Sequence, residues 1–223
     1  SSVSCASPSP CFASSSMLRC GYHGPMADDE PDPTDRLLRW TVVERTLVHD
    51  FRIFRAHRAR VRHPTSGAVH DFTVLDGGDW VNVIALTADD QVVLLRQYRA
   101  GTDRIEVEIP GGLVDPGEDH ATAARRELAE ETGYTAPRWR HLGSTSPNPA
   151  IQGNRLHTYL ALDAACTEPP SPDDGEALAV WTAPLAEVTA MLRAGRIDHA
   201  LVVVAFAHLA LADGLTLARP PQP

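Results

Sequence analysis

The sequence predicts an α/β protein in which helices cover both faces of a mixed β-sheet, preceded by a small antiparallel β subdomain. Near-continuous apolar runs at 80–87 and 91–99 are typical of strands that are buried on both faces. A helical stretch within 118–133 lies between strand-like segments, and two more helical stretches follow the last strand. Strands that flank a central helix, with two helices after them, favour an α/β/α sandwich around a mixed sheet.

Composition divides the chain into four segments. Residues 1–35 lack apolar periodicity and end in the acidic, proline-broken run DDEPDPTD, so we expect a disordered tail. An antiparallel β subdomain is expected at 36–77, and the main α/β domain at 78–215. The last residues, 216–223, are expected to form a flexible tail.

The subdomain at 36–77 contains three strand-like runs, TVVERTLVHD, FRIFRAHRARVR and VHDFTVLD, with a turn at Pro64–Gly67. These runs predict a three-stranded antiparallel meander. Arginines alternate with apolar residues between 52 and 62, so one face meets either solvent or a partner. The sequence leaves that choice open.

The main domain is expected to begin with a hairpin, in which Ala88–Asp90 form the turn between the two apolar runs. Its other elements are expected to be a strand at 105–110 leading into a glycine-rich turn, a helix ending at Gly133, strands at 139–146, 155–162 and 178–184, a helix at 185–193 closed by Gly195, and a last helix capped by Asp198 and ending at Asp213-Gly214. His157 lies on an apolar strand and is interpreted as a core histidine.

Three glutamates on the central helix carry the strongest chemical signal. Glu127, Glu130 and Glu131 fall within about a third of the helix circumference, where like charges repel. A hard divalent cation would compensate, and Mg²⁺ or Mn²⁺ accepts carboxylate oxygens together with phosphate oxygens. The alternative is a solvated acidic face, and the spacing of the surrounding residues argues against it.

The stretch from 112 to 134, GLVDPGEDHATAARRELAEETGY, fits G-x5-E-x7-R-E-U-x-E-E-x-G-U, where U is aliphatic. Only the last position departs, because Tyr134 stands where an aliphatic residue is usual. The pattern resembles the Nudix box, the motif of the Nudix hydrolase family. The resemblance covers roughly 78–215, and the preceding meander resembles the N-terminal subdomain of the ADP-ribose pyrophosphatase branch.

The resemblance implies a metal site that holds Mg²⁺, or Mn²⁺ in its place. Its expected ligands are Glu127, Glu130, Glu131 and the backbone carbonyl of Gly112. Glu130 and Arg126 are the expected catalytic residues of the box. Arg126 can brace a neighbouring carboxylate through a bidentate pair and so fix its rotamer for metal binding.

Outside the box, five residues are expected to bind the substrate. Arg96, Tyr98 and Arg99 lie near the end of one strand, where arginine forks suit phosphate and an aromatic ring suits a base or ribose. Glu108 lies on the strand that enters the glycine turn and is preferred to Glu106. Pro149 stands about sixteen residues beyond the box, where the resembling branch has a proline.

The general base has two candidate locations. The resembling branch often takes it from a mobile loop, which here is 168–180 with the carboxylates Asp173, Asp174 and Glu176. Glu176 is ranked first among them because it lies just before the closing strand. The alternative is that the box helix supplies the base and the loop is simply solvated.

The resemblance implies hydrolysis of the pyrophosphate bond of ADP-ribose or a related nucleoside diphosphate sugar, giving a nucleoside monophosphate and a sugar phosphate. Rival substrates are diadenosine polyphosphates, oxidised nucleotides and capped RNA. A module that keeps the fold and senses a nucleotide without turnover is the alternative from another class. The complete set of Glu127, Glu130 and Glu131 with Arg126 favours the enzyme.

Composition bounds the partners. The formal net charge of -9 argues against nucleic acid, although bound metal ions would still admit a small anionic substrate. The longest apolar run is too short to span a membrane, and four cysteines without a C-x-x-C pair give weak support to a reducing, cytoplasmic location. A homodimer is expected, because the meander is too small to hold its own core and resembles a subdomain that is exchanged between protomers.

Overall fold

The computed structural model describes residues 33–172 and 175–215, which fall into two compact units divided between Arg39 and Trp40. The described part of the first unit contains the helix α1 (Pro33–Leu38). This helix crosses the expected boundary at residue 35, so the chain is already helical where the sequence predicts the end of a tail. Residues 1–32 of the tail expected at 1–35, and the tail expected at 216–223, lie outside the described residues.

The second unit begins with the predicted meander, the antiparallel strands β1 (Thr41–Asp50), β2 (Phe54–Arg62) and β3 (Val69–Gly77). In this sheet Ala59 is buried, whereas every residue of β1 is exposed. The sheet is tied to the rest of the unit through Leu75, whose N–H donates to the carbonyl of Ile151 at 2.7 Å. As expected, the meander does not enclose a core of its own among the described residues.

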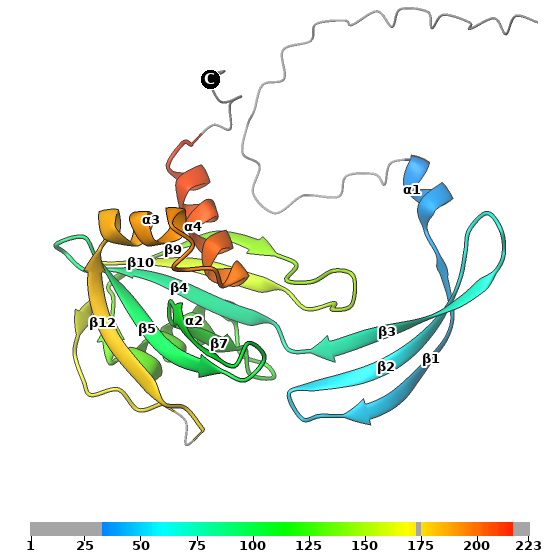
Figure 1. Ribbon diagram of the computed structural model, residues 1–223, viewed down its shortest axis with the longest axis horizontal. Helices are drawn as coiled ribbons and strands as arrows, with labels where there is room; N and C mark the ends of the chain where they lie inside the picture. Colours follow the sequence, from blue (N-terminus) through cyan, green and yellow to red (C-terminus); the bar gives the residue numbers. More distant parts are fainter. Residues whose placement is uncertain (1–32, 173–174, 216–223) are drawn as a thin grey trace, which may run out of the picture. The chain divides into compact units, whose positions relative to one another are not determined.

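A seven-stranded mixed sheet forms the centre of the unit (Figure 1). Its strands are β4 (Trp80–Leu86), β5 (Gln91–Arg99), β6 (Arg104–Glu108), β7 (Gly111–Leu113), β9 (Arg138–Thr145), β10 (Leu156–Leu162) and β12 (Leu178–Pro184). The main path runs β12-β5-β4-β10-β9, with β6 on β5 and β7 on β4. Among the described strands of this sheet, β10 and β4 are the pair that runs in parallel. The short strands β8 (Tyr134–Thr135) and β11 (Ala165–Cys166) form a separate ladder.

The predicted hairpin of β4 and β5 is only partly present. The two strands pair at Leu86 and Val92 and then separate, because β4 turns to β7 and β5 turns to β6. The glycine segment expected to be a turn is therefore a strand over Gly111–Leu113, inserted beside β4. This splitting of the sheet puts the glycines next to the central helix.

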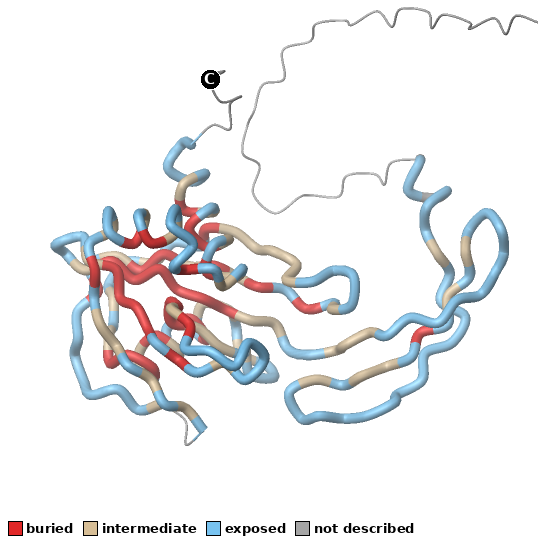
Figure 2. The backbone as a smooth tube through the Cα atoms, in the orientation of Figure 1, coloured by how far each residue is buried: buried red, intermediate tan, exposed pale blue. Residues whose placement is uncertain are grey.

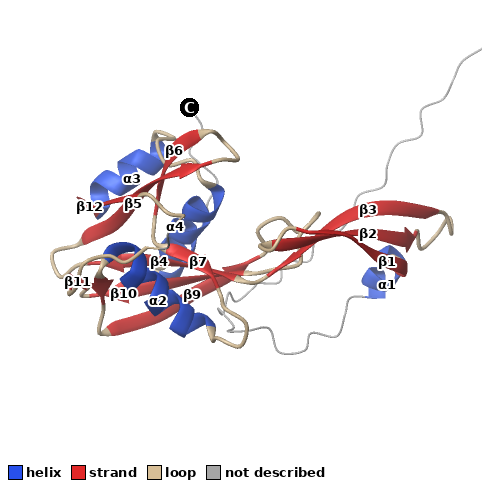
Figure 3. Ribbon diagram, turned by 90° about the horizontal axis from the view of Figure 1, so that it is seen from below, coloured by secondary structure: helices blue, strands red, loops and turns tan. Residues whose placement is uncertain are grey.

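Helices cover both faces of the sheet, which confirms the α/β/α sandwich (Figures 1 and 3). Helix α2 (His120–Thr132) packs on one face, while α3 (Leu185–Arg193) and α4 (Ala200–Ala212) pack on the other. Strand β4 serves both layers, since Val83 packs toward α2 and Ile84 toward α3 and α4. Figure 2 shows the buried residues concentrated in these central strands.

The ends of the helices follow local sequence signals. Asp119 caps α2 by accepting the N–H groups of Ala121 and Thr122, and Gly133 ends it with a left-handed φ of 73° as predicted. The expectation that Asp198 caps α4 is wrong. The cap position is His199, and the Asp198 carboxylate instead accepts from Arg104 at 3.2 Å, because that cation is within its reach.

Changing Gly133 to Ala tests the end of the box helix. The left-handed φ costs about 1–2 kcal/mol for any residue with a Cβ, and here the Cβ would also meet the carbonyl oxygen of Glu168. We expect urea unfolding to show a loss of more than about 2 kcal/mol. Gly117→Ala is the control for strain alone, because its φ is 87° and no atom lies within 4 Å of the added methyl. Equal losses of stability in the two variants would contradict a steric clash between the added methyl group and Glu168.

Candidate active site

A cavity of about 800 Å³ opens where β3, β4, β6, β7 and α2 come together. Box residues form one wall of it, namely Gly112, Arg126, Glu127, Glu130 and Glu131. The lining also includes apolar residues of the meander and of α4, among them Phe54 and Leu201. The cavity therefore combines a dense group of carboxylates with apolar surface that suits a larger organic ligand.

The glycine strand fits tightly against the box helix. The Glu131 carboxylate accepts the Gly111 N–H at 2.8 Å, and Glu131 is only 3% exposed. A Cβ at Gly112 would lie 2.5 Å from the Glu127 carboxylate. Glycine at 112 therefore lets the backbone come within contact distance of the carboxylates, which is the close approach that the motif predicts.

Arg126 organises the other carboxylates of the box. Its guanidinium binds Glu118 with two bonds of 3.1 and 2.9 Å and also donates to the carbonyl of Leu113 at 2.9 Å. One nitrogen reaches Glu127 at 2.9 Å and Glu130 at 3.1 Å. The predicted bidentate brace thus holds Glu118 in place, while single bonds orient the two carboxylates of the helix face.

Two glutamates of the box have pKa values above the value of an exposed glutamate. Burial, with further contributions from Glu127 and Glu176, raises the pKa of Glu131 to about 8. Burial raises the pKa of Glu127 to about 6, against the lowering effect of Arg126. Burial disfavours the ionised form of both carboxylates and a bound divalent cation would favour it, so their oxygen donors fit such a cation.

A second arginine–carboxylate pair also lines the cavity. Arg99 donates to both oxygens of Glu108, at 2.6 and 2.7 Å, and both residues line the cavity. Glu108 is 5% exposed, whereas 42% of the Arg99 side chain is accessible. Glu108 therefore anchors Arg99 and leaves part of its guanidinium facing the cavity.

Three predicted substrate residues are not among those that line this cavity. Arg96 lies over the ring of Trp181 at 5.2 Å, and the hydroxyl of Tyr98 donates to Asp103 at 2.9 Å. Both belong to the opposite face of β5 from Arg99, since side chains alternate along a strand. Pro149 is exposed in a turn, although Gln152 farther along the same loop reaches the cavity.

The candidate bases from the loop divide into two groups. Glu176 lines the cavity, and its carboxylate accepts from Gln97 at 3.5 Å. Its charge contributes to raising the pKa values of Glu127 and Glu131. Asp173 and Asp174 lie outside the described residues.

The cavity also includes polar residues that the sequence analysis did not select. Asn82 donates to the carbonyl of Leu201 at 3.0 Å, which leaves its buried Oδ1 without a hydrogen-bond partner in the described chain. His199 Nδ1 is buried and equally without a partner there. Both residues line the cavity from segments far from the box in sequence, and each carries a buried polar atom that lacks a partner in the described chain.

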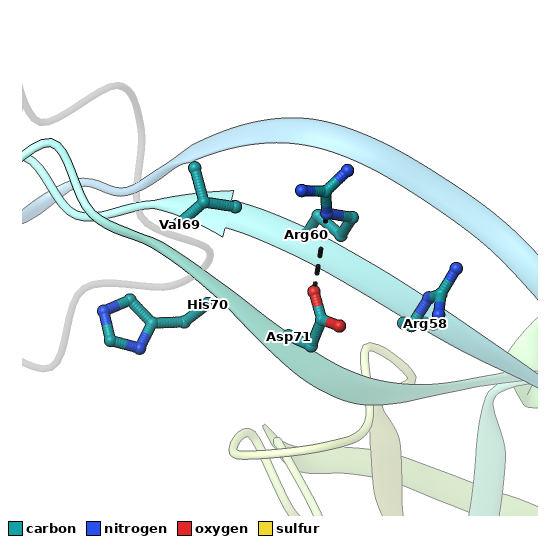
Figure 4. Close-up of a pocket in the computed structure, with 5 residues that line it drawn as sticks. All are labelled: Arg58, Arg60, Val69, His70 and Asp71. Atoms are coloured by element: carbon teal, nitrogen blue, oxygen red, sulfur yellow. Dashed lines mark ion pairs between the residues drawn. The ribbon is translucent and has the colours of Figure 1, made fainter.

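A second hollow lies on the meander and belongs to a different surface (Figure 4). It has a volume of about 630 Å³ and is lined by Arg58, Arg60, Val69, His70 and Asp71. All five are exposed, and Arg60 approaches Asp71 at 3.6 Å. None of these residues belongs to the box, so the chemistry is assigned to the cavity at α2.

Comparison with known proteins agrees with this assignment. The NUDIX domain model matches residues 79–204. The chain is 32% identical over 136 residues to the methanol dehydrogenase activator of Bacillus methanolicus, and 29% identical over 136 residues to the ADP-ribose pyrophosphatase of Bacillus subtilis. Each match covers 60% of this chain and 74% of the relative.

A solved structure described as an ADP compounds hydrolase has the same fold, with a TM-score of 0.69 and 25% identity. The match covers 80% of this chain and 97% of that one. The matched family region spans more than half of the chain and contains the complete box. The chain therefore belongs to the Nudix hydrolase family, in the branch that includes ADP-ribose pyrophosphatases.

Proposed function

We propose that this chain hydrolyses the pyrophosphate bond of ADP-ribose or a closely related nucleoside diphosphate sugar. The products are a nucleoside monophosphate and a sugar phosphate. The observation that carries the proposal is the cavity itself, which joins the box carboxylates and Arg99 to apolar surface from the meander. That combination suits a ligand with a charged centre and larger organic ends.

The metal requirement rests on the carboxylates. Glu127 and Glu131, with Glu130 at the rim and the Gly112 carbonyl beside them, would hold Mg²⁺ or Mn²⁺. When bound, the ion supplies positive charge that polarises phosphoryl oxygens and acidifies water. Arg126 keeps the carboxylates oriented, and Gly112 keeps the space in front of Glu127 clear.

Substrate recognition is assigned to groups around the box. The exposed part of Arg99 suits a phosphate oxygen, and Glu108 holds it in a fixed orientation. Asn82 Oδ1 and His199 Nδ1 offer buried polar atoms to the ribose or base. Phe54 and Leu201 supply apolar surface for the organic ends.

The choice of ADP-ribose is supported by two similar proteins, since one relative is an ADP-ribose pyrophosphatase and one solved structure is an ADP compounds hydrolase. Another relative of comparable similarity is a methanol dehydrogenase activator. The experiment must therefore compare several nucleoside diphosphate derivatives side by side.

The meander supports a homodimer in which residues 36–77 contribute to the substrate pocket of the partner. Its exposed apolar side chains include Val42, Val48, Phe51, Ile53 and Phe72. A second copy that covers this surface would remove it from water, which an isolated three-stranded sheet cannot do alone.

The first test is a hydrolysis screen of the parent and of Glu131→Gln with Mg²⁺. We expect release of AMP from ADP-ribose by the parent, and turnover lower by about three powers of ten or more in the variant. Glu187→Gln is the control, because Glu187 is exposed on α3. Hydrolysis at the parent rate by Glu131→Gln would refute the role of the box, and preference for diadenosine polyphosphates would refute the substrate class.

The second test measures stability without metal. A carboxyl whose pKa is raised from 4.5 to about 8 on folding binds more protons in the native state, so its contribution to stability falls as pH rises across that range. Glu131→Gln removes the charge, and we expect it to be more stable than the parent by on the order of a few kcal/mol at about pH 9.

At about pH 5 the parent carboxyl is protonated, so the two proteins should differ much less. Urea unfolding in EDTA at both pH values measures the difference, with Glu187→Gln as the exposed control. A difference between Glu131→Gln and the parent that does not change with pH would contradict the raised pKa.

The third test locates the general base. If Glu176 is the base, Glu176→Gln should lower kcat by about 10²–10⁴-fold and remove the acidic limb of its pH profile. The double change Asp173→Asn and Asp174→Asn tests the other loop carboxylates. Parent-like rates and acidic limbs in both proteins would assign the base to the box helix instead.

The fourth test is sedimentation at micromolar concentration. We expect a dimer for the parent, and a shift toward monomer for Val48→Asp, which places a charge on the exposed apolar surface of β1. Val203→Asp on α4 is a matched control, since Val203 is also an exposed apolar residue. A parent that is monomeric throughout this range would refute the dimer.

A further inference from the structure

Three side chains outside the carboxylate cluster converge beside the start of the box helix. Asp79 precedes β4, His120 is the first residue of α2, and His157 lies on β10. One donor atom from each lies within 4.8 Å of the other two. Histidine and aspartate from three separate segments form the donor set that transition-metal sites use.

The distances match a metal site. The Nε2 atom of His120 lies 3.2 Å from Asp79 Oδ2, and the Nε2 atom of His157 lies 3.5 Å from the same oxygen. Ligand atoms at about 2.0–2.1 Å from a tetrahedral zinc ion are separated by about 3.3 Å. The two imidazole rings are stacked with centroids 3.6 Å apart, and because imidazole lone pairs lie in the ring plane, the rings must tilt apart for both nitrogens to bind one ion.

The supporting contacts orient the donors. Asp79 Oδ1 accepts the backbone N–H of Arg155 at 2.7 Å, which leaves Oδ2 for the two histidines. The Nδ1 atom of His157 pairs with the hydroxyl of Ser144 at 2.8 Å. When that nitrogen carries the proton, Nε2 presents its lone pair toward Asp79, as outer hydrogen bonds do at metal sites.

A simple ion pair accounts less well for this arrangement. His157 Nε2 is fully buried and has no hydrogen-bond partner in the described chain, even though Asp79 is near. Two protonated rings stacked at 3.6 Å would also repel each other. A cation between the three donors satisfies the buried nitrogen and lets both rings stay neutral.

We propose that Asp79, His120 and His157 bind a zinc-class divalent cation at a site separate from the Nudix box. Two imidazoles and one carboxylate favour Zn²⁺ over Mg²⁺, which prefers oxygen ligands. Asp79 and His120 are partly exposed, so water or another small ligand completes the coordination. The interpretation of His157 as a core histidine is thereby replaced by a ligand role.

The position of the site gives it a structural consequence. His120 lies seven residues before Glu127, about 10 Å along the helix, so the two sites are neighbours without sharing a ligand. The backbone carbonyl of Asp79 accepts the N–H of Val114, which follows the glycine strand. Zn²⁺ at this site would connect the start of α2 to the residue before β4. Through the Asp79–Val114 hydrogen bond, it would also connect them to the segment that carries Gly112.

The experiment is a Zn²⁺ titration of the chelator-treated full chain in excess Mg²⁺, followed by calorimetry and by X-ray absorption at the zinc edge. We expect one equivalent of Zn²⁺ with imidazole ligands and a rise in the unfolding temperature. Glu127→Gln with Glu131→Gln should bind the same equivalent, because the box does not contribute ligands.

His120→Ala and Asp79→Asn should weaken Zn²⁺ binding by about a hundredfold or more. His70→Ala is the control, since that residue is exposed on β3 and is outside the donor set. A parent that takes up no Zn²⁺ in excess Mg²⁺ would overturn the site. The site would also be overturned if the variant with Glu127→Gln and Glu131→Gln did not bind the equivalent of Zn²⁺. Parent-like Zn²⁺ affinity in both His120→Ala and Asp79→Asn would overturn it as well. The parent measurement decides the matter even if a variant fails to fold.

Discussion

The contact between the glycine strand and the buried face of the box helix is the constraint on which the site depends. Glu131 accepts the Gly111 N–H, and the Glu127 carboxylate lies so close to Gly112 that a methyl group there would not fit. This contact is possible only because β5 separates from β4 after one pair and gives its place to β7. The separation of β5 from β4 therefore leaves a position beside β4, and the glycines of the motif occupy it as β7.

Two arginines form ion pairs with the carboxylates of this site. Arg126 joins Glu118, Glu127 and Glu130, whereas Arg99 is held by Glu108. Each arginine keeps its charge at all relevant pH values, because its carboxylate partners raise its pKa further. Burial raises the pKa of Glu131 to about 8 and that of Glu127 to about 6, so these two carboxylates change protonation near neutral pH.

Local signals explain which parts of the fold the sequence could predict. The period of the box helix and the left-handed glycine at 133 determine α2, and the strand and helix at 178–193 agree with the prediction at both ends. The splitting of β4 from β5 is a tertiary event, since both runs are equally apolar. Asp198 could not be recognised as the partner of Arg104, because 94 residues separate them.

The site was predictable to the extent that one segment contains it. The box residues meet as the motif requires, whereas Asn82 and His199 come from segments that only the fold brings together. Alternation along β5 could have separated Arg99 from Arg96 and Tyr98, because adjacent residues point to opposite faces. The donors Asp79, His120 and His157 are far apart in the sequence and form no motif. They are recognised as a group because the fold brings their donor atoms together.

Because the glycines lie in a strand and not in a free loop, the unfolding of the site is coupled to that of the sheet. Strand β7 pairs with β4 at three positions, and the carbonyl of Pro110 accepts the N–H of Val83 at 2.8 Å. Val83 is fully buried in the core beneath α2. Opening the glycine segment therefore disturbs a central strand, so the site and the main sheet belong to one cooperative unit of unfolding.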